Sequence, residues 1–185
     1  MQGERLKIRL VHFLNETTAF LHILSRGDTM KLQNDKPYLI SIAIPLAVGA
    51  AASFFTMAGL PYYNMQEKPF FSPPNALFPI VWTVLYILMG ISAARIWKSG
   101  DLNQWKALKT YAFQLIINFL WSVLFFGLQQ YFLAFLWLLL LIGMVAKMIK
   151  EFAQIDPLAA KLQIPYLLWC IFAAILNFGV WWLNR

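Results

Sequence analysis

The side chains of this sequence that could do chemistry within an apolar protein are amides, hydroxyls and aromatic rings, and they recur at helical spacing. In the stretch 108–126 the recurring residues are Gln114, Asn118, Trp121, Ser122 and Phe125. Similar stripes are formed by Asn75, Phe78, Trp82, Tyr86 and Met89, and by Tyr166, Trp169, Cys170, Ala173 and Asn177. Such spacing places each stripe on one face of a helix. Because amides are costly in hydrocarbon, we expect the three faces to converge on an aromatic interior that offers ring stacking and hydrogen bonds.

Each stripe also has a purely structural interpretation. Amides such as Gln114 and Asn118 often do no more than hydrogen-bond a neighbouring membrane helix. Tryptophans at span ends are typical interfacial anchors, and these are Trp97, Trp105, Trp181 and Trp182. For Trp82, Trp121 and Trp169, which lie deeper or beside amides, packing and ligand binding stay open as equal alternatives.

Several kinds of site are disfavoured by what the sequence lacks. No Asp, Glu, Arg or His falls in the middle of an apolar stretch, which argues against a proton relay or an ion-coupled carrier. No nucleophile–base set and no glycine-rich phosphate loop is present. The single cysteine, Cys170, excludes a disulfide framework and is typical of an apolar filler. We expect neither a metal nor a cofactor.

The elements that must position these residues are membrane helices. The chain has 185 residues, of which 61% are hydrophobic and 12% charged, with a formal net charge of +7. Its mean hydropathy is +0.62. The positive charge could suggest nucleic acid, but the charges lie between apolar runs, so we expect the lipid bilayer and no nucleic acid as partner. The apolar runs cover 38–58, 75–97, 108–126, 131–149 and 158–183.

Each run is near the ~20 residues that an α-helix needs to cross a membrane. The alternation of a barrel strand is absent, so the sequence predicts an all-α membrane protein, a bundle of five transmembrane helices. Pro45 and Pro165 should kink the first and fifth helices. The fourth run contains no polar residue in FLAFLWLLLLIGMVA, and we expect it to face lipid.

The basic residues predict the orientation of this integral, multi-pass protein. Thirteen of the fifteen Lys and Arg residues lie in 1–36, 95–109 and 147–161, which share one side of the bundle. The other side has only Lys68 and Arg185. The positive-inside rule therefore places the N-terminus in the cytoplasm and the C-terminus outside.

A proline-rich first loop, predicted to act as a lid, follows the first run. Within 61–74 the prolines should prevent a continuous helix, because each lacks an N–H and restricts its preceding residue. Glu67 and Lys68 are the charges of this loop. Either the two side chains form a solvated pair, or Lys68 contacts an anionic group of a ligand.

Residues 1–36 form a separate N-terminal tail of mixed charge, which we expect to be dispensable. It is either disordered, a short surface helix, or, over residues 1–29, the product of an over-long start. Residues 37–185 form the membrane domain.

Four motifs in this domain resemble the translocator protein or tryptophan-rich sensory protein (TspO) family, also known as the peripheral benzodiazepine receptor family. They are Tyr63 with EKPFFSPP and VWTVLYILMG, QLIINFLWSVLFFG, DPLAAKLQIPYLLW, and FAAILNFGVWWLN. The resemblance implies a five-helix bundle whose first loop covers a pocket. It implies binding of tetrapyrroles such as protoporphyrin, of sterols and of synthetic aromatic ligands. A light-dependent enzyme that degrades porphyrin and a porphyrin or sterol transport protein are the alternatives.

The resemblance and the stripes together give the expected site. Trp82 and Trp169 correspond to the tryptophans linked to porphyrin degradation and would be catalytic only if porphyrin is degraded. The expected ligand-binding residues are Tyr62, Tyr63, Phe71, Pro73, Phe78, Trp82, Tyr86, Gln114, Asn118, Trp121, Tyr166, Trp169, Cys170 and Ala173.

The sequence departs from the family pattern at four positions. Tyr62 and Phe71 replace loop tryptophans, so each keeps a ring and loses an indole N–H. Trp137 stands where some members carry an acidic residue, so we expect no polar contact from the fourth helix. Phe178 replaces the tyrosine of the sterol-recognition pattern, which argues against sterol binding.

A homodimer and a bacterial cell membrane are the expected assembly and location. Small residues with the spacing of helix contacts occur at Ala43, Ala47 and Ala51, and at Gly90 and Ala94. Close packing within one chain is the alternative for these residues.

Overall fold

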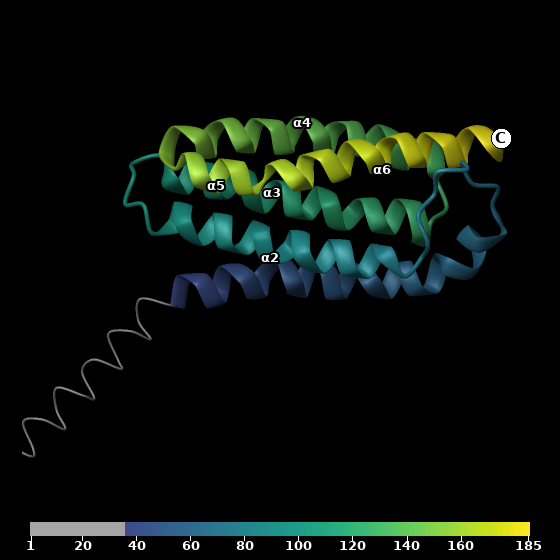
Figure 1. The fold of residues 1–185 in the computed structure, drawn as a ribbon, viewed down its shortest axis with the longest axis horizontal. Helices are drawn as coiled ribbons and strands as arrows, with labels where there is room; N and C mark the ends of the chain where they lie inside the picture. The colour runs from purple at the N-terminus through teal and green to yellow at the C-terminus, as the bar shows by residue number, and fades with distance from the viewer. Residues whose placement is uncertain (1–35) are drawn as a thin grey trace, which may run out of the picture. The chain divides into compact units, whose positions relative to one another are not determined.

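The computed structural model describes residues 36–185, so the predictions for the tail lie outside the described residues. Five membrane-length helical segments fill this part, which contains no strand, and the predicted all-α bundle is confirmed (Figure 1). The first helix is Lys36–Met65. The others are α2 (Leu77–Trp97), α3 (Gln104–Ser122) with the short π-helix η1 (Val123–Gly127), α4 (Tyr131–Ile155), and α5 (Pro157–Leu162) followed by α6 (Ile164–Leu183).

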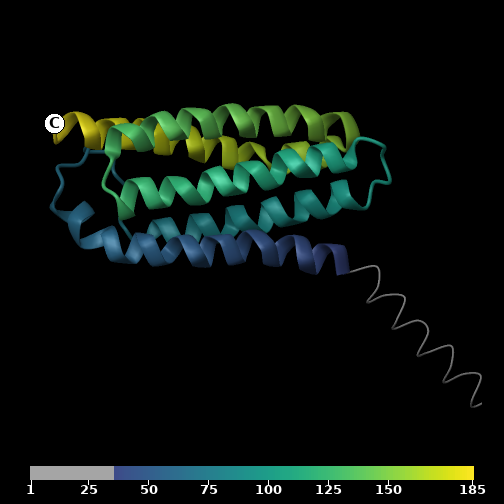
Figure 2. The ribbon, with the colours of Figure 1, turned by 180° about the vertical axis from the view of Figure 1, so that it is seen from behind.

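Both views of the bundle place the first helix beside α2 and away from α4 (Figures 1 and 2). Glycines make this packing possible. A Cβ atom added at Gly49 would overlap the Tyr86 ring of α2, and one added at Gly90 would overlap the backbone of Ile42. Gly90 therefore serves packing within one chain, as the alternative interpretation had it, whereas Ala43, Ala47 and Ala51 are exposed.

The expectation that α4 faces lipid is wrong for one of its faces. Its buried residues follow a spacing of three and four: Ala134, Leu138, Leu141, Val145, Met148 and Phe152. In the most apolar 18-residue stretch of α4, 28% of the residues are buried, whereas the corresponding stretch of the first helix has 17% buried. An all-apolar helix gives no sequence signal here, because lipid tails and a protein core are equally apolar.

Prolines act differently in the first helix and at the start of α6. Pro61 lies inside the first helix, which continues to Met65, and no helix runs on through 66–74, so the prediction that 61–74 holds no continuous helix is confirmed. One proline removes one N–H, and a membrane helix can pass through it. The fifth run, which we expected to kink at Pro165, is instead interrupted at Gln163, between α5 and α6. Pro165 itself occupies the first turn of α6, where an N–H would have no helical partner.

The turn between α4 and α5 is fixed by Asp156. Its carboxylate accepts hydrogen bonds from the backbone N–H groups of Leu158 (2.8 Å) and Ala159 (3.2 Å) and so caps α5. Its second oxygen lies 2.7 Å from the Nε of Arg95, in the last turn of α2. Burial alone would raise the pKa of Asp156, but the Arg95 guanidinium and the two backbone hydrogen bonds lower it below its ordinary value.

Candidate functional site

The loop after the first helix is fastened to the C-terminal end of α6. Asn184 accepts a hydrogen bond from the backbone N–H of Glu67 (3.0 Å) and donates one to the Glu67 carbonyl (2.9 Å). The ring of Pro69 lies against Gly179, where any Cβ atom would overlap it. This pair of contacts holds the loop across one end of the bundle, where a lid would lie (Figure 1).

Asn64 joins the two ends of this loop. Its side-chain oxygen accepts hydrogen bonds from Lys68 Nζ (3.2 Å) and from Asn75 Nδ2 (2.8 Å). The ammonium of Lys68 also lies 4.3 Å from the centre of the Tyr63 ring. Within residues 36–185 no ion pair links Lys68 to Glu67, so Lys68 serves the loop's own structure.

Beneath the loop, rings and amides from three helices form what we call the interior cluster: Trp82, Tyr86, Asn118, Trp121 and Tyr166. Trp82 stacks on Tyr86 at 5.5 Å between ring centres and contacts Trp121 (6.4 Å) and Tyr166 (6.3 Å). These contacts bring α2, α3 and α6 together, as the three stripes predicted.

A chain of hydrogen bonds holds the interior cluster. The Tyr86 hydroxyl donates to Asn118 Oδ1 (3.3 Å), Asn118 Nδ2 donates to the Tyr166 hydroxyl (2.8 Å), and that hydroxyl donates to Gln114 Oε1 (2.9 Å). The indole of Trp121 donates to Asn177 Oδ1 (3.3 Å). The amides therefore fix the orientation of the surrounding rings.

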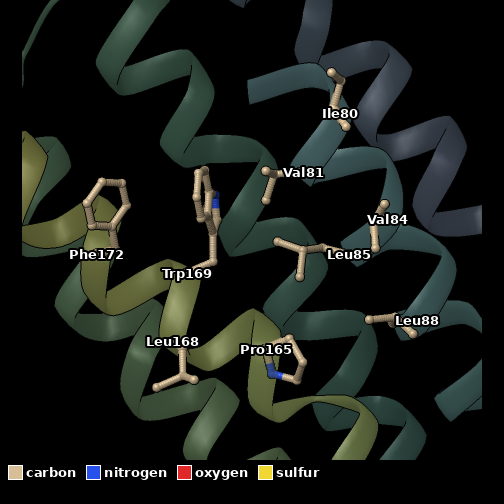
Figure 3. Close-up of a pocket in the computed structure, with 9 residues that line it drawn as sticks. All are labelled: Ile80, Val81, Val84, Leu85, Leu88, Pro165, Leu168, Trp169 and Phe172. Carbon is tan, nitrogen blue, oxygen red and sulfur yellow. The ribbon is translucent and has the colours of Figure 1, made fainter. Parts of the chain in front are cut away.

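A groove opens between α2 and α6, and we call it the α2–α6 groove. Its volume is about 500 Å³, and its lining is apolar: Ile80, Val81, Val84, Leu85, Leu88, Pro165, Leu168, Trp169 and Phe172. Figure 3 shows Trp169 and Phe172 rising from α6 while Val81 and Leu85 approach from α2. This volume lies within the ~300–1,000 Å³ usual for small-molecule sites.

A row of rings connects the loop to this groove. Phe71 of the loop contacts Phe172 at 6.4 Å, Phe172 contacts Trp169 at 5.4 Å, and Trp169 contacts Phe78 at 6.1 Å. Phe71 therefore reaches the groove through its ring, although it has no indole N–H.

The structure separates the sequence-predicted residues into three groups. The first group forms the interior cluster or bonds to it: Trp82, Tyr86, Gln114, Asn118, Trp121 and Tyr166. Three further predicted residues are buried close to the same helices: Tyr63, Cys170 and Ala173. Phe71, Phe78 and Trp169 meet along the groove. Tyr62 is 52% exposed and Pro73 is half-buried, and no ring contact or side-chain hydrogen bond brings either to these groups within the described chain.

Three features were not predicted. The expectation of no polar contact from α4 is wrong, because the Trp137 indole donates to the Ile117 carbonyl at 2.9 Å. Phe172 lines the groove and lies three residues after Trp169, a spacing that could have identified it. Asn184, which fastens the loop, lies beyond the last stripe, and no sequence pattern indicated it.

Within residues 36–185, no group of three or more His, Cys, Asp or Glu side chains is placed to hold a metal. The site therefore offers ring stacking, apolar burial and neutral hydrogen bonds. These interactions suit a flat apolar ligand.

Known proteins resemble this chain over the whole bundle. A sequence model of the TspO/MBR family matches residues 41–183. A tryptophan-rich protein TspO of Archaeoglobus fulgidus is 42% identical over 145 residues, covering 78% of this chain and 94% of that protein. A tryptophan-rich protein TspO of Chlorobaculum tepidum is 38% identical over 155 residues, with 78% and 94% covered. The translocator protein of Homo sapiens is 36% identical over 145 residues, with 76% and 85% covered.

Proposed function

This chain belongs to the TspO/MBR family, and we propose that it is a membrane receptor or sensor that binds tetrapyrroles such as protoporphyrin in the α2–α6 groove. The observation that carries this proposal is the groove itself. The groove has a volume of about 500 Å³ and an apolar lining, and the indole of Trp169 forms part of that lining. A macrocycle bound there would stack on Trp169 and bury its faces against aliphatic side chains.

The interior cluster supports the groove from behind. Tyr166 belongs to the cluster, and Trp169 follows it by one turn on the same helix, so a fixed Tyr166 restrains the wall that carries Trp169. A rigid aromatic wall loses little conformational freedom when a ligand binds, which favours affinity. The loop reaches the same wall through Phe71 and acts as a lid.

Protoporphyrin titration tests the proposal. We expect the Soret band to shift and tryptophan fluorescence to fall at micromolar ligand. Replacing Trp169 with Ala should weaken binding about tenfold, which corresponds to about 1.4 kcal/mol. Trp182→Ala is the matched control, because Trp182 is 49% exposed at the far end of α6 and lies outside the groove. Equal affinity in both variants, or no signal at micromolar ligand, would exclude the groove.

Light-dependent degradation of porphyrin is the second candidate function. Trp169 lines the groove, and Trp82 belongs to the interior cluster behind it, so one oxidisable indole would contact a bound macrocycle and a second lies in the supporting wall. Illumination of the complex distinguishes the two functions. Loss of the Soret band that is faster than in a Trp82→Phe, Trp169→Phe double variant indicates an enzyme, whereas a stable band indicates a receptor. Binding with neither quenching nor loss would favour a transport protein.

We propose further that the protein forms a homodimer in a bacterial cell membrane, with its N-terminus in the cytoplasm. Ala43, Ala47 and Ala51 lie exposed on one face of the first helix, so a second copy could approach closely there. Ala47→Phe should convert the dimer to a monomer in native mass spectrometry in mild detergent. An unchanged dimer would move the interface elsewhere.

The orientation has its own test. Cys170 is buried, so a cysteine introduced into the protein would be the residue that a thiol reagent reaches first. Phe70→Cys, in the loop, should react with an impermeant maleimide added outside intact cells, and Ser99→Cys should react only after lysis. The opposite pattern would reverse the proposed orientation.

A further inference from the structure

Within residues 36–185, three buried polar side chains carry hydrogen-bonding atoms without a protein partner. Tyr111, Gln114 and Gln163 are 6%, 0% and 0% exposed. The Tyr111 hydroxyl, Gln114 Nε2 and both side-chain atoms of the Gln163 amide find no partner within residues 36–185. Native cores rarely leave such groups unsatisfied, since a buried donor without an acceptor is destabilising.

Gln114 is joined to Tyr166 at one level of the bundle, and Tyr111 and Gln163 lie nearly one helical turn away from that level, toward the same end. Figure 1 shows α3 and α6 running in the same direction, and the bond from the Tyr166 hydroxyl to Gln114 Oε1 (2.9 Å) joins them. Tyr111 precedes Gln114 by three residues on α3, and Gln163 precedes Tyr166 by three residues on the chain entering α6. A separation of three residues corresponds to about 4.5 Å along a helix axis, and both separations run in the same direction. Tyr111 and Gln163 are therefore displaced from the joined pair toward the same end.

Buried apolar residues lie beside Tyr111 and shortly before Gln163. The Tyr111 ring lies 6.3 Å from that of Phe152 on α4, which is fully buried. Ala159 and Ala160 of α5, four and three residues before Gln163, are also buried. A group of unpartnered donors and acceptors enclosed by such residues is the kind of environment in which proteins hold internal water.

The chemistry of the unpartnered atoms matches water in particular. Gln163 presents one acceptor and one donor group, Gln114 presents a donor, and the Tyr111 hydroxyl can act as either. Buried waters typically make about three hydrogen bonds of mixed kind. No charged group is among the four atoms, so an ion has nothing to neutralise it.

We propose that Tyr111, Gln114 and Gln163 form a binding site for one or more ordered water molecules. The site continues the chain Gln114–Tyr166–Asn118–Tyr86 from the interior cluster toward α5. It gives the core a hydrated polar site on the side of the cluster away from the loop. This proposal is independent of the ligand that the groove takes.

Radiolytic hydroxyl-radical labelling of the full-length protein in lipid nanodiscs tests the site. Radicals form from water, so a buried ring is labelled quickly only when water lies beside it. We expect Tyr111 and Phe152 to be labelled at least threefold faster than Phe125, a ring that is 4% exposed in a different part of the core. Labelling no faster than at Phe125 would overturn the proposal.

Matched variants show whether these side chains hold the water. Gln163→Leu keeps the size of the side chain and removes both polar atoms, so labelling of Tyr111 and Phe152 should fall to the level of Phe125. Gln154→Leu makes the same change at an exposed position of α4 and should alter nothing. If Gln163→Leu does not fold, Tyr111→Phe still tests the site, with an expected twofold or greater loss of labelling at Phe152. Unchanged labelling in the folded variant would overturn the assignment.

Discussion

The interior cluster and the α2–α6 groove are both built from aromatic residues, but they differ in what holds their rings. In the cluster, the hydroxyls of Tyr86 and Tyr166 and the indole of Trp121 are hydrogen-bonded to amides. In the groove, Trp169 meets Phe78 and Phe172 through ring contacts alone, among aliphatic side chains. The cluster is therefore a fixed support, and the groove is a surface that a ligand can occupy.

This difference assigns different tasks to two tryptophans that the family resemblance pairs. Trp82 packs against Tyr86, Trp121 and Tyr166, so most of its ring surface faces protein. Trp169 stands in the groove (Figure 3). We expect changes in the cluster to alter mainly the free energy of unfolding, and changes in the groove to alter mainly ligand affinity.

The largest expected effect comes from truncating the buried ring of the cluster. Trp121 is 7% exposed and contacts Trp82, Phe125 and Phe126, so Trp121→Ala leaves a cavity. The free energy of unfolding should fall by about 3–5 kcal/mol. Trp169→Ala should cost about 1 kcal/mol or less, because lipid can fill part of the space that it leaves. Reversible unfolding in mixed micelles, followed by circular dichroism, measures both, and equal losses would contradict the distinction.

A smaller effect is expected when the hydrogen-bond chain of the cluster is cut. Asn118→Leu keeps the volume but leaves the Tyr86 hydroxyl without its acceptor, which should cost about 1–3 kcal/mol of unfolding free energy. Thr83→Val is the control, because Thr83 is exposed and bonds only the Pro79 carbonyl of its own helix. The same unfolding assay applies. A loss in Asn118→Leu no larger than that of the control would show that the chain does not stabilise the bundle.

Loosening the loop should change ligand dissociation from the groove more than it changes the stability that the cluster provides. Asn184→Ala removes the two hydrogen bonds to Glu67, and a net loss of about 1 kcal/mol corresponds to roughly fivefold faster dissociation of protoporphyrin. Stopped-flow tryptophan fluorescence measures this rate. Asn103→Ala, an exposed change at the start of α3, should leave it unchanged. Equal dissociation rates in the two variants would mean that the loop does not close the groove.

The five spans and the three converging stripes could be predicted because amides and charges interrupt the apolar runs at informative places. The burial of α4 could not be predicted, because Leu138 and Leu139 are adjacent residues of the same type. Leu138 is buried, whereas Leu139 is 48% exposed. Only the packing of α3 and α6 determines which of these two leucines faces inward.

The division between cluster and groove was also beyond the sequence. On α6, the buried residues Tyr166, Cys170, Ala173 and Asn177 follow the inward face, and Trp169 lies about 60° from Tyr166 around the helix. That small rotation carries the indole from the core to the α2–α6 groove. A stripe predicts which side of a helix is inward, but it does not predict which neighbouring helix a residue at its edge will meet.

The smallest expected effect is a change in the free energy of unfolding with pH. It arises at Asp156, which lies at the end of the bundle opposite the loop. The folded pKa of Asp156 lies below its ordinary value of 3.8, so its interactions with Arg95 and the start of α5 contribute stability above that pH. This contribution is lost as the pH falls through the folded pKa. Because the ion pair is partly exposed, we expect a loss of less than about 1 kcal/mol in wild type below pH 4.

The variant Asp156→Asn should show no such acid-dependent step, whereas Asn118→Leu should keep it in full. The cluster has neutral amides and hydroxyls, and it shares no hydrogen-bond partner with Asp156, so the two changes should add. Unfolding free energies of the single and double variants between pH 7 and pH 3 measure this additivity. A coupling of more than about 0.5 kcal/mol would mean that the ion pair and the cluster form one cooperative unit, and the support for the groove would then extend through the whole bundle.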